Sequence, residues 1–308
     1  MGAELSIPFF LHGFEDFSAD IGDGVRLERV NPDWIESVRE QCPDVNARES
    51  LDLNGIYTHR FYIEIDPTTS SPFDITEDEI QPLFRAVCLS HIVKPTAIAI
   101  ENVKIKTIYE QDGTVSHFCM VAAANMNIAF TSPDESWNTI TEQDCRRMAA
   151  FWPSFCELLA DSNLARPKYS RIVNAIKNFE YAHYIYFTNL SYLAYHAALE
   201  FLIYFGTTRE NKKQITLRLP QILKGIVTQQ EAEEIYSLNN HFKHGPDPSG
   251  KFTLGSNQQD VIRLTALLRR CIRELLLRAL ANRSFADILV DYDLMRKHYG
   301  VQVGKKII

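Results

Sequence analysis

The first half of the chain alternates short β-rich runs with turn-forming residues. His59–Asp66 (HRFYIEID) has the composition of a strand, and residues 97–123 contain two β-branched runs separated by Asp112-Gly113, a strong hairpin signal. The turn formers in DPTTSSPFD and TSPDES divide the rest of this half into short pieces. Residues 1–160 are therefore predicted to form a β-rich N-terminal domain, with a long hairpin near Ala97 to Ala123.

The second half has helical periodicity. In TITEQDCRR, Thr141 has the position of an N-cap, with Asp144 three residues on as in a capping box. Residues 190–205 (LSYLAYHAALEFLIYF) are apolar nearly all round, as in a helix buried at the centre of a bundle. Further helices are predicted in YSRIVNAIKNFEYAHYIYF, KQITLRLPQIL, TQQEAEEIYSLNNHFKH and NQQDVIRLTALLRRCIRELLLRALAN. The expected fold class is α+β, with a helical bundle over residues 161–308.

Charge divides the chain in the same place. Residues 1–150 hold 11 Lys+Arg against 25 Asp+Glu, a balance of −14, whereas residues 151–308 hold 21 against 14, a balance of +7. The asymmetry indicates two domains with different tasks, the second able to approach a polyanion such as RNA. Surface charge also drifts between domains without functional meaning, so this second interpretation stays open.

Several classes of function lack their usual signals. The six cysteines form no C-x-x-C pair, which favours reduced thiols over a zinc site or a disulfide framework. The chain has no P-loop, Gly-x-Gly-x-x-Gly, His-Glu-x-x-His or Gly-x-Ser-x-Gly motif, and neither a metal nor a cofactor is expected. The N-terminal residues do not have the pattern of a signal peptide, and no segment has about 18 consecutive apolar residues. The expected location is cytoplasmic, without membrane contact.

Three short elements follow one another within residues 168–283. They are Ala198-Leu199-Glu200 on the apolar helix, Leu217-Arg218-Leu219, and the closing His244-Gly245. Their order and spacing resemble a HEPN domain of the ApeA-like branch. The strand-rich half resembles the N-terminal domain found in many such proteins, where it would sense a trigger or bind a protein partner.

The resemblance implies a metal-independent RNA endonuclease that works as a homodimer and leaves a 2′,3′-cyclic phosphate. The family's catalytic motif is an arginine, usually a polar residue next to it, and a histidine. A cation holds the scissile phosphate, and an imidazole passes protons to or from the reacting oxygens. On this sequence the histidine is His244, the polar residue is Asn240, and Asn239 stands where the arginine belongs. An amide can donate a hydrogen bond to phosphate, but it carries no charge.

Nearby basic residues supply other cations. The candidates for RNA binding are Lys243, His241, Arg269, Arg270 and Arg273. If the helix continues through His244, then Asn240, His241 and His244 share a face. The alternative interpretation is an ordinary helix end at His244-Gly245-Pro246, with the arginines on a solvated face. Glu200 is expected to pair with Arg218, and His183 and His196 are expected to lie in the core.

Two functional hypotheses result. The first is a defence- or toxin-associated HEPN ribonuclease with a degenerate motif, for which Asn239→Arg is expected to fold and to raise RNA cleavage. The second is a catalytically inactive HEPN dimer that serves as a binding or scaffold subunit of an antiviral complex. A homodimer is expected in both, because the apolar helices offer more apolar surface than one small bundle hides. Any RNA affinity is expected to reside in residues 160–308 and to depend on salt.

Overall fold

The structure is a computed structural model of the 308-residue chain. It describes residues 2–9, 18–31, 33, 34, 36, 40, 59–66, 68, 74–94, 103–109, 111, 115–122, 140–185, 188–205, 211–244, 258–300, 302–303 and 306–307. The chain divides into two compact units: Met1–Ile128 with Trp137–Pro153, and a second unit that contains Ser154–Ile308. The division falls inside helix α5, whereas the sequence pattern placed the domain boundary at residue 160.

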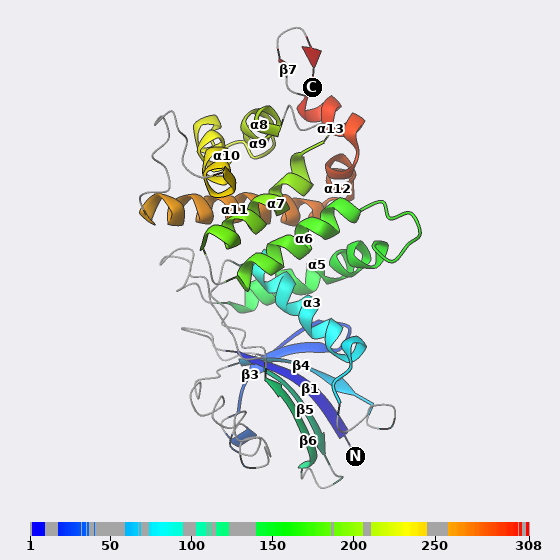
Figure 1. Ribbon diagram of the computed structural model, residues 1–308. Helices are drawn as coiled ribbons and strands as arrows, with labels where there is room; N and C mark the ends of the chain where they lie inside the picture. The colour runs from blue at the N-terminus through cyan, green and yellow to red at the C-terminus, as the bar shows by residue number, and fades with distance from the viewer. Residues whose placement is uncertain are drawn as a thin grey trace. The chain divides into compact units, whose positions relative to one another are not determined.

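The first unit is built on an antiparallel sheet with the strand order β2-β3-β4-β1-β5-β6 (Figure 1). The strands are β1 (Gly2–Phe9), β2 (Ala19–Gly22), β3 (Val25–Arg29), β4 (His59–Ile65), β5 (Val103–Tyr109) and β6 (Val115–Ala122). The pairing of β5 with β6 confirms the predicted hairpin, although Asp112-Gly113 lies outside the described residues.

The two faces of this sheet differ in chemistry because successive side chains along a strand point to opposite sides. Leu5, Phe61 and Leu27 are fully buried on the face that helix α3 (Glu77–Val93) covers. On the other face Glu4 accepts hydrogen bonds from Trp34, Arg60 and Tyr109. Burial, with Glu4 beside it, raises the pKa of Tyr109 to about 12.

The sequence pattern predicts only strands in this half of the chain, whereas the structure also has helix α3. A capping box of Thr76 and Glu79 begins it, with Glu79 Oε2 2.8 Å from the Thr76 amide nitrogen. Pro82 lies in the second turn and has no amide proton, so the helical hydrogen bond to the Asp78 carbonyl is absent there. The Thr-x-x-Glu spacing was the available signal.

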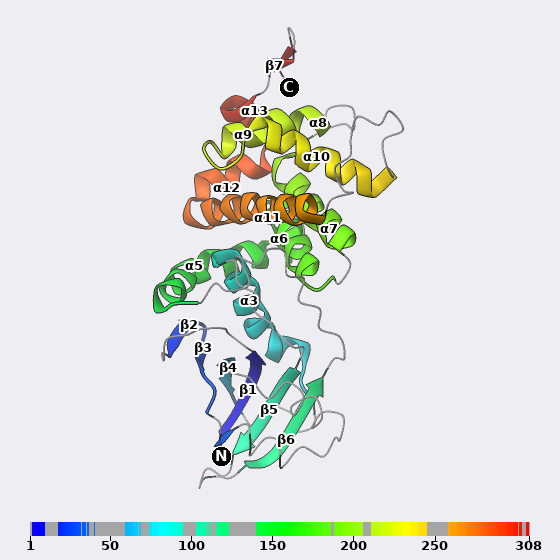
Figure 2. The same cartoon turned by 90° about the vertical axis from the view of Figure 1, so that its left-hand side faces the viewer.

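The second unit is helical (Figure 2). Its helices are α6 (Ser170–His183), α7 (Thr188–Ile203), α8 (Asn211–Lys213), α9 (Leu219–Ile222), α10 (Gln229–His244), α11 (Gln258–Ala281), α12 (Arg283–Val290) and α13 (Tyr292–Tyr299), together with the last residues of α5 (Glu142–Asp161) and a π-helical turn, η2 (Gln214–Arg218). A two-stranded ladder of β7 (Gln302–Val303) and β8 (Lys306–Ile307) follows. The mixture confirms the α+β class.

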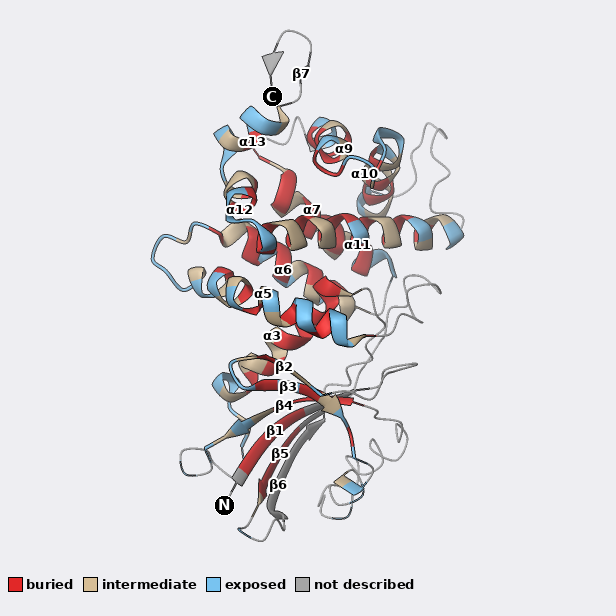
Figure 3. Ribbon diagram, turned by 180° about the vertical axis from the view of Figure 1, so that it is seen from behind, coloured by how far each residue is buried: buried red, intermediate tan, exposed pale blue. Residues whose placement is uncertain are grey.

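Helix α7 is the central element of this unit. It contacts α6, α10 and α11 (Figure 3). Its fully buried residues lie on one side, whereas residues of the other side such as Leu193 and Phe201 are half-buried, so the helix is less enclosed than its uniformly apolar sequence predicted. The predicted N-cap of α5 is also confirmed: Thr141 Oγ1 accepts from the Asp144 amide at 3.3 Å, and Asp144 Oδ2 accepts from the Thr141 amide at 3.0 Å.

Two further findings concern the classes excluded above. In the described part of the chain, no helix has both the length and the apolar character that crossing a membrane requires. Cys88, Cys145, Cys156 and Cys271 are free thiols. Burial raises the pKa of both Cys145 and Cys271 to about 12, so these two stay protonated at neutral pH.

Candidate functional site

Helix α10 carries the residues that the sequence suggests as a catalytic motif, and local chemistry fixes where the helix begins. Glu231 Oε2 accepts from the Thr228 amide at 2.8 Å, and Thr228 Oγ1 accepts from the Glu231 amide at 3.2 Å, which completes a capping box. The buried side chains then recur at helical spacing through Ala232, Ile235, Leu238 and Asn239. Asn239 therefore occupies a place that the pattern gives to an apolar residue.

The helix continues through His244, which meets the geometric condition for a shared face. His244 and Lys243 are exposed in its last turn, and Asn240 and His241 are half-buried one turn earlier. Side chains three or four residues apart are neighbours on a helix, so Asn240, His241 and His244 lie along one side. This side offers imidazoles that can move a proton, whereas the Lys243 ammonium lies nearer the Asn239 side and 3.8 Å from Glu200 of α7.

Asn239 does not belong to that side. Its side chain is only 1% exposed, and five residues along a helix rotate it about 140° away from His244. Its amide nitrogen and oxygen have no hydrogen-bond partner among the described residues. The structure therefore separates the two outer positions of the motif, one in the core and one in solvent.

The three arginines of α11 lie in different environments. Arg269 is 4% exposed, with Nη2 3.2 Å from His183 Nε2 and its guanidinium over the ring of Tyr195, so this position argues against a phosphate contact. Arg273 is half-buried, and Arg270 is exposed. Acidic residues on α10 face the same helix, since Glu234 accepts from Arg263 at 2.7 Å.

Glu200 does not pair with Arg218, contrary to the sequence expectation. Glu200 Oε1 lies 3.3 Å from His196 Nδ1, on the same helix, and 3.8 Å from Lys243 Nζ on α10. Burial alone would raise the pKa of Glu200, but His196 and Lys243 outweigh burial and hold it below its usual range. Because Glu200 is partly exposed, water solvates the remaining carboxylate and no guanidinium is required.

Arg218 is fully buried and serves a structural purpose instead. Its Nη1 donates to the Ile203 carbonyl at 2.8 Å and to Gln214 Oε1 at 2.7 Å, and its Nε donates to the Tyr299 carbonyl at 3.3 Å. The first of these carbonyls belongs to the last turn of α7, where unpaired oxygens carry partial negative charge. Arg218 thus caps α7 and ties the end of α13 to it.

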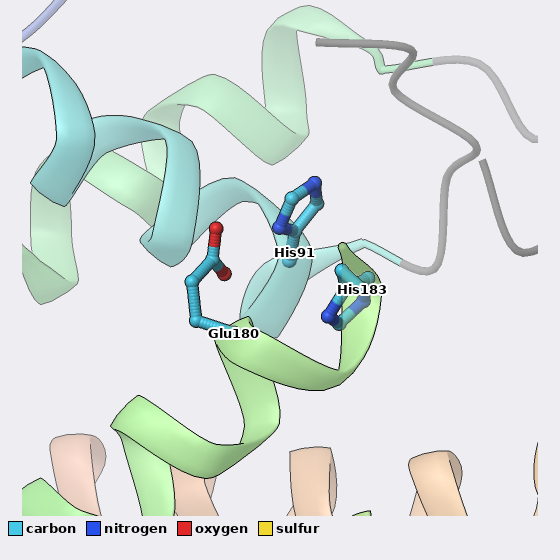
Figure 4. Close-up of side chains that lie close together, drawn as sticks. All are labelled: His91, Glu180 and His183. Carbon is cyan, nitrogen blue, oxygen red and sulfur yellow. The ribbon is translucent and has the colours of Figure 1, made fainter. Parts of the chain in front are cut away.

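His183 lies against the core, as expected. Its Nδ1 is 2.8 Å from the Phe179 carbonyl and its Nε2 faces Arg269, so both ring nitrogens have contacts within their own unit. Figure 4 shows His183 with Glu180 on α6; the third labelled side chain, His91, belongs to α3 of the first unit. Two side chains from one helix do not by themselves make a metal site.

The cluster of His196, Glu200, Asn239 and Lys243 is what sequence reasoning missed; His196 and Asn239 are buried, Glu200 is half-buried and Lys243 is exposed. His196 and Glu200 are four residues apart on a helix that is otherwise apolar, and this spacing was a usable signal. The contributions of Asn239 and Lys243 depend on how α10 is rotated against α7. That rotation is set by tertiary packing, for which the local pattern holds no signal.

The chemical capacity of the α10 side follows from this geometry. His244 and Lys243 can supply a proton and a point charge to a bound anion, but the arrangement holds no guanidinium at the motif position. Comparison with known proteins adds no family: no family model, no curated protein and no solved structure matches the chain.

Proposed function

We propose that the C-terminal unit is a HEPN-like binding module that does not cleave RNA. In this proposal the chain is a cytoplasmic, defence-associated scaffold subunit, and its N-terminal unit binds a protein partner or senses a trigger. The supporting observation is the position of Asn239, which is buried on the side of α10 away from His244. A neutral amide held there cannot stabilise charge at a phosphate beside His244.

The size of the expected loss in catalytic rate supports a binding role over RNA cleavage. Removing one preorganised donor from a developing oxyanion lowers the rate by about 10² to 10³ in enzymes where it has been measured. Here the missing group also carries the charge of the motif. A binding role, by contrast, needs only the exposed side of the last turn and the fold that holds it.

A second candidate is the metal-independent ribonuclease itself. One observation favours it: His244, His241 and Lys243 lie together in the last two turns of α10, with Asn240 one turn before His244. His244 would then act as acid and base, while Asn240 orients the substrate and a nearby cation holds phosphate. Both candidates carry the homodimer and the salt-dependent RNA contact as expectations.

One experiment separates the two candidates. Purified protein is incubated with total RNA and with defined tRNAs in EDTA, using wild type, His244→Ala and the control His298→Ala. His298 is also exposed in the last turn of a helix, so the control matches the loss of an imidazole. We expect no cleavage by any of the three proteins.

Cleavage with the following properties would identify the ribonuclease. EDTA-resistant cleavage by wild type and His298→Ala that is lost in His244→Ala, with 2′,3′-cyclic phosphate ends, contradicts the binding-module proposal and establishes the ribonuclease.

A further inference from the structure

The interface between α7 and α10 has a hydrogen bond and an aromatic contact at one end and an ion pair at the other. The Tyr192 hydroxyl donates to the Ile235 carbonyl at 2.8 Å, and the Tyr192 ring lies 5.5 Å from that of Phe242. Two turns further along α7, Glu200 lies 3.8 Å from Lys243. His196 is midway between Tyr192 and Glu200, so it occupies the centre of the contact.

Asn239 occupies the corresponding place on α10. It is three or four residues from Ile235, Tyr236, Phe242 and Lys243, all of which contact α7. Such residues surround one position on a helix surface, and Asn239 is buried, so its side chain faces α7. We call the four residues His196, Glu200, Asn239 and Lys243 the polar seam.

The centre of the polar seam is poorly satisfied. His196 is 0% exposed, and its two ring nitrogens have no well-formed hydrogen bond among the described residues, since Glu200 approaches Nδ1 only as an ionic contact. Neither polar atom of the Asn239 amide has a partner there either. Buried polar groups without partners weaken a contact, so α10 is held less firmly than its apolar stripe suggests.

Protonation adds a second effect. Burial lowers the pKa of His196; Glu200 opposes this shift and Lys243 reinforces it. A histidine whose pKa is lowered in the closed contact binds a proton more readily once the contact opens. The neutral imidazole is therefore compatible with the closed contact, and acid favours the open one below the usual histidine pKa of about 6.5.

Charged groups on the other sides of α7 do not reverse the lowering of the His196 pKa. Arg269 of α11 and His183 of α6 lie against Tyr195, and Arg218 of η2 reaches the Ile203 carbonyl at the end of α7. On α10, Tyr236 faces His196 with its ring centroid 6.3 Å away. Only Glu200 among these groups favours a charged His196, and its effect is smaller than that of burial.

We propose that the polar seam is an interhelical contact that opens on protonation, which we call the catch. Neutral His196 keeps α10 against α7, and a proton on His196 releases α10, which frees Asn239 and the end of α10 that carries Lys243 and His244. This regulation goes beyond the binding function and does not depend on whether the unit acts on RNA.

Hydrogen exchange of the full chain tests the catch. Amide protection of residues 229–244 is measured by mass spectrometry between pH 7.5 and pH 5.5, each rate divided by that of an unfolded chain at the same pH. We expect protection of α10 to fall by up to about tenfold per pH unit below pH 6.5, relative to α6, since one proton is taken up on opening. His196→Phe should remove this pH dependence.

Two further variants separate titration from poor hydrogen bonding. Asn239→Leu removes an unsatisfied amide, so α10 should gain protection at every pH while its pH dependence stays. Glu200→Gln removes the group that favours a charged His196, so the pH dependence should become steeper or extend to lower pH. If His196→Phe keeps the wild-type pH dependence, or if Asn239→Leu abolishes it, the catch is wrong. Should His196→Phe fail to fold, an unchanged profile in Glu200→Gln contradicts the proposal on its own.

Discussion

Asn239 is the residue that most changes what the sequence alone suggested. At an exposed position, an amide in place of arginine would be a weakened catalytic group that substitution could restore. At a position that is 1% exposed, it is a core residue of the α7–α10 contact. The same letter in the sequence thus has a different chemical meaning once the rotation of the helix is known.

We therefore expect Asn239→Arg to destabilise the protein rather than to restore cleavage. A guanidinium without a counter-ion in the core costs about 3 to 5 kcal/mol, and the expectation that this variant folds normally is revised accordingly. Asn240→Arg is the matched control, because its side chain is half-buried and can reach solvent. Urea unfolding measures both. Equal stability of the two variants would mean that residue 239 is not in the core.

Gly22 supplies a second test at this scale. Its φ is +139°, and a Cβ there would lie 2.3 Å from the indole of Trp152, which is itself held by a 2.9 Å hydrogen bond to Asp23. Gly22→Ala should lower the free energy of unfolding by about 2 kcal/mol or more. Gly24→Ala, with φ +77° and only Ile63 nearby at 3.8 Å, should cost about 1 kcal/mol. Chemical denaturation that ranks them the other way contradicts the close approach to Trp152.

At the scale of elements, helices and hairpins encoded within one segment were predicted from the sequence. Contacts that depend on packing between segments were not. The β5–β6 hairpin, α5 with its Thr141 cap, and the apolar helix α7 follow from spacing and turn residues within one segment. Helix α3 has an equally local signal in Thr76 and Glu79, which the strand-like character of its surroundings hid. Glu200 and Arg218 also have partners on other helices, Lys243 and the Ile203 carbonyl, and no pattern within one segment specifies these contacts.

Asp144 makes the start of α5 sensitive to acid. Burial would raise its pKa, but hydrogen bonds from Thr141 and Lys94 outweigh burial and lower it below the ordinary value. This stabilisation is present above about pH 4 and is lost as pH falls through the depressed pKa. Asp144→Asn should therefore cost about 1 kcal/mol at pH 7 and progressively less below pH 4.

Unfolding at pH 7 and at pH 3 measures this difference. Glu142→Gln is the control, because the pair that Glu142 forms with Arg146 is exposed, and its loss should change stability by less than about 0.5 kcal/mol. A difference between Asp144→Asn and wild type that does not shrink in acid would show that the carboxylate charge is not what stabilises the cap.

At the scale of the whole molecule, the reason for expecting a dimer has changed. The apolar residues of α7 and α11 from which it was inferred are mostly buried within the single chain, and others, such as Phe201 and Leu267, are half-buried. Apolar surface remains elsewhere in the described residues: Tyr181 in the last turn of α6 is 63% exposed, and Tyr184, just after α6, and Leu190, in the first turn of α7, are also exposed. A homodimer stays a prediction, and this surface is where we expect its contact.

Multi-angle light scattering tests that contact at micromolar concentration. Wild type should have the mass of a dimer, and Tyr181→Ser with Tyr184→Ser should shift it to a monomer, because aromatic side chains dominate such contacts. Leu164→Ser removes an apolar side chain that is also exposed, at 59%, and should leave the dimer intact. A monomeric wild type rules out a homodimer in both functional candidates.

The bond from Arg218 to the carbonyl of Tyr299 bears on how the protein is made. The ribosome adds about 5 to 20 residues per second, so Arg218 emerges several seconds before the acceptor that lies 81 residues further on. Until then a guanidinium destined for the core lacks one of its partners, and burying it early is unfavourable. The helical unit should thus complete its core late in synthesis, and nascent chains that stop before residue 299 should engage chaperones and be cleaved by proteases more readily than chains that extend past it.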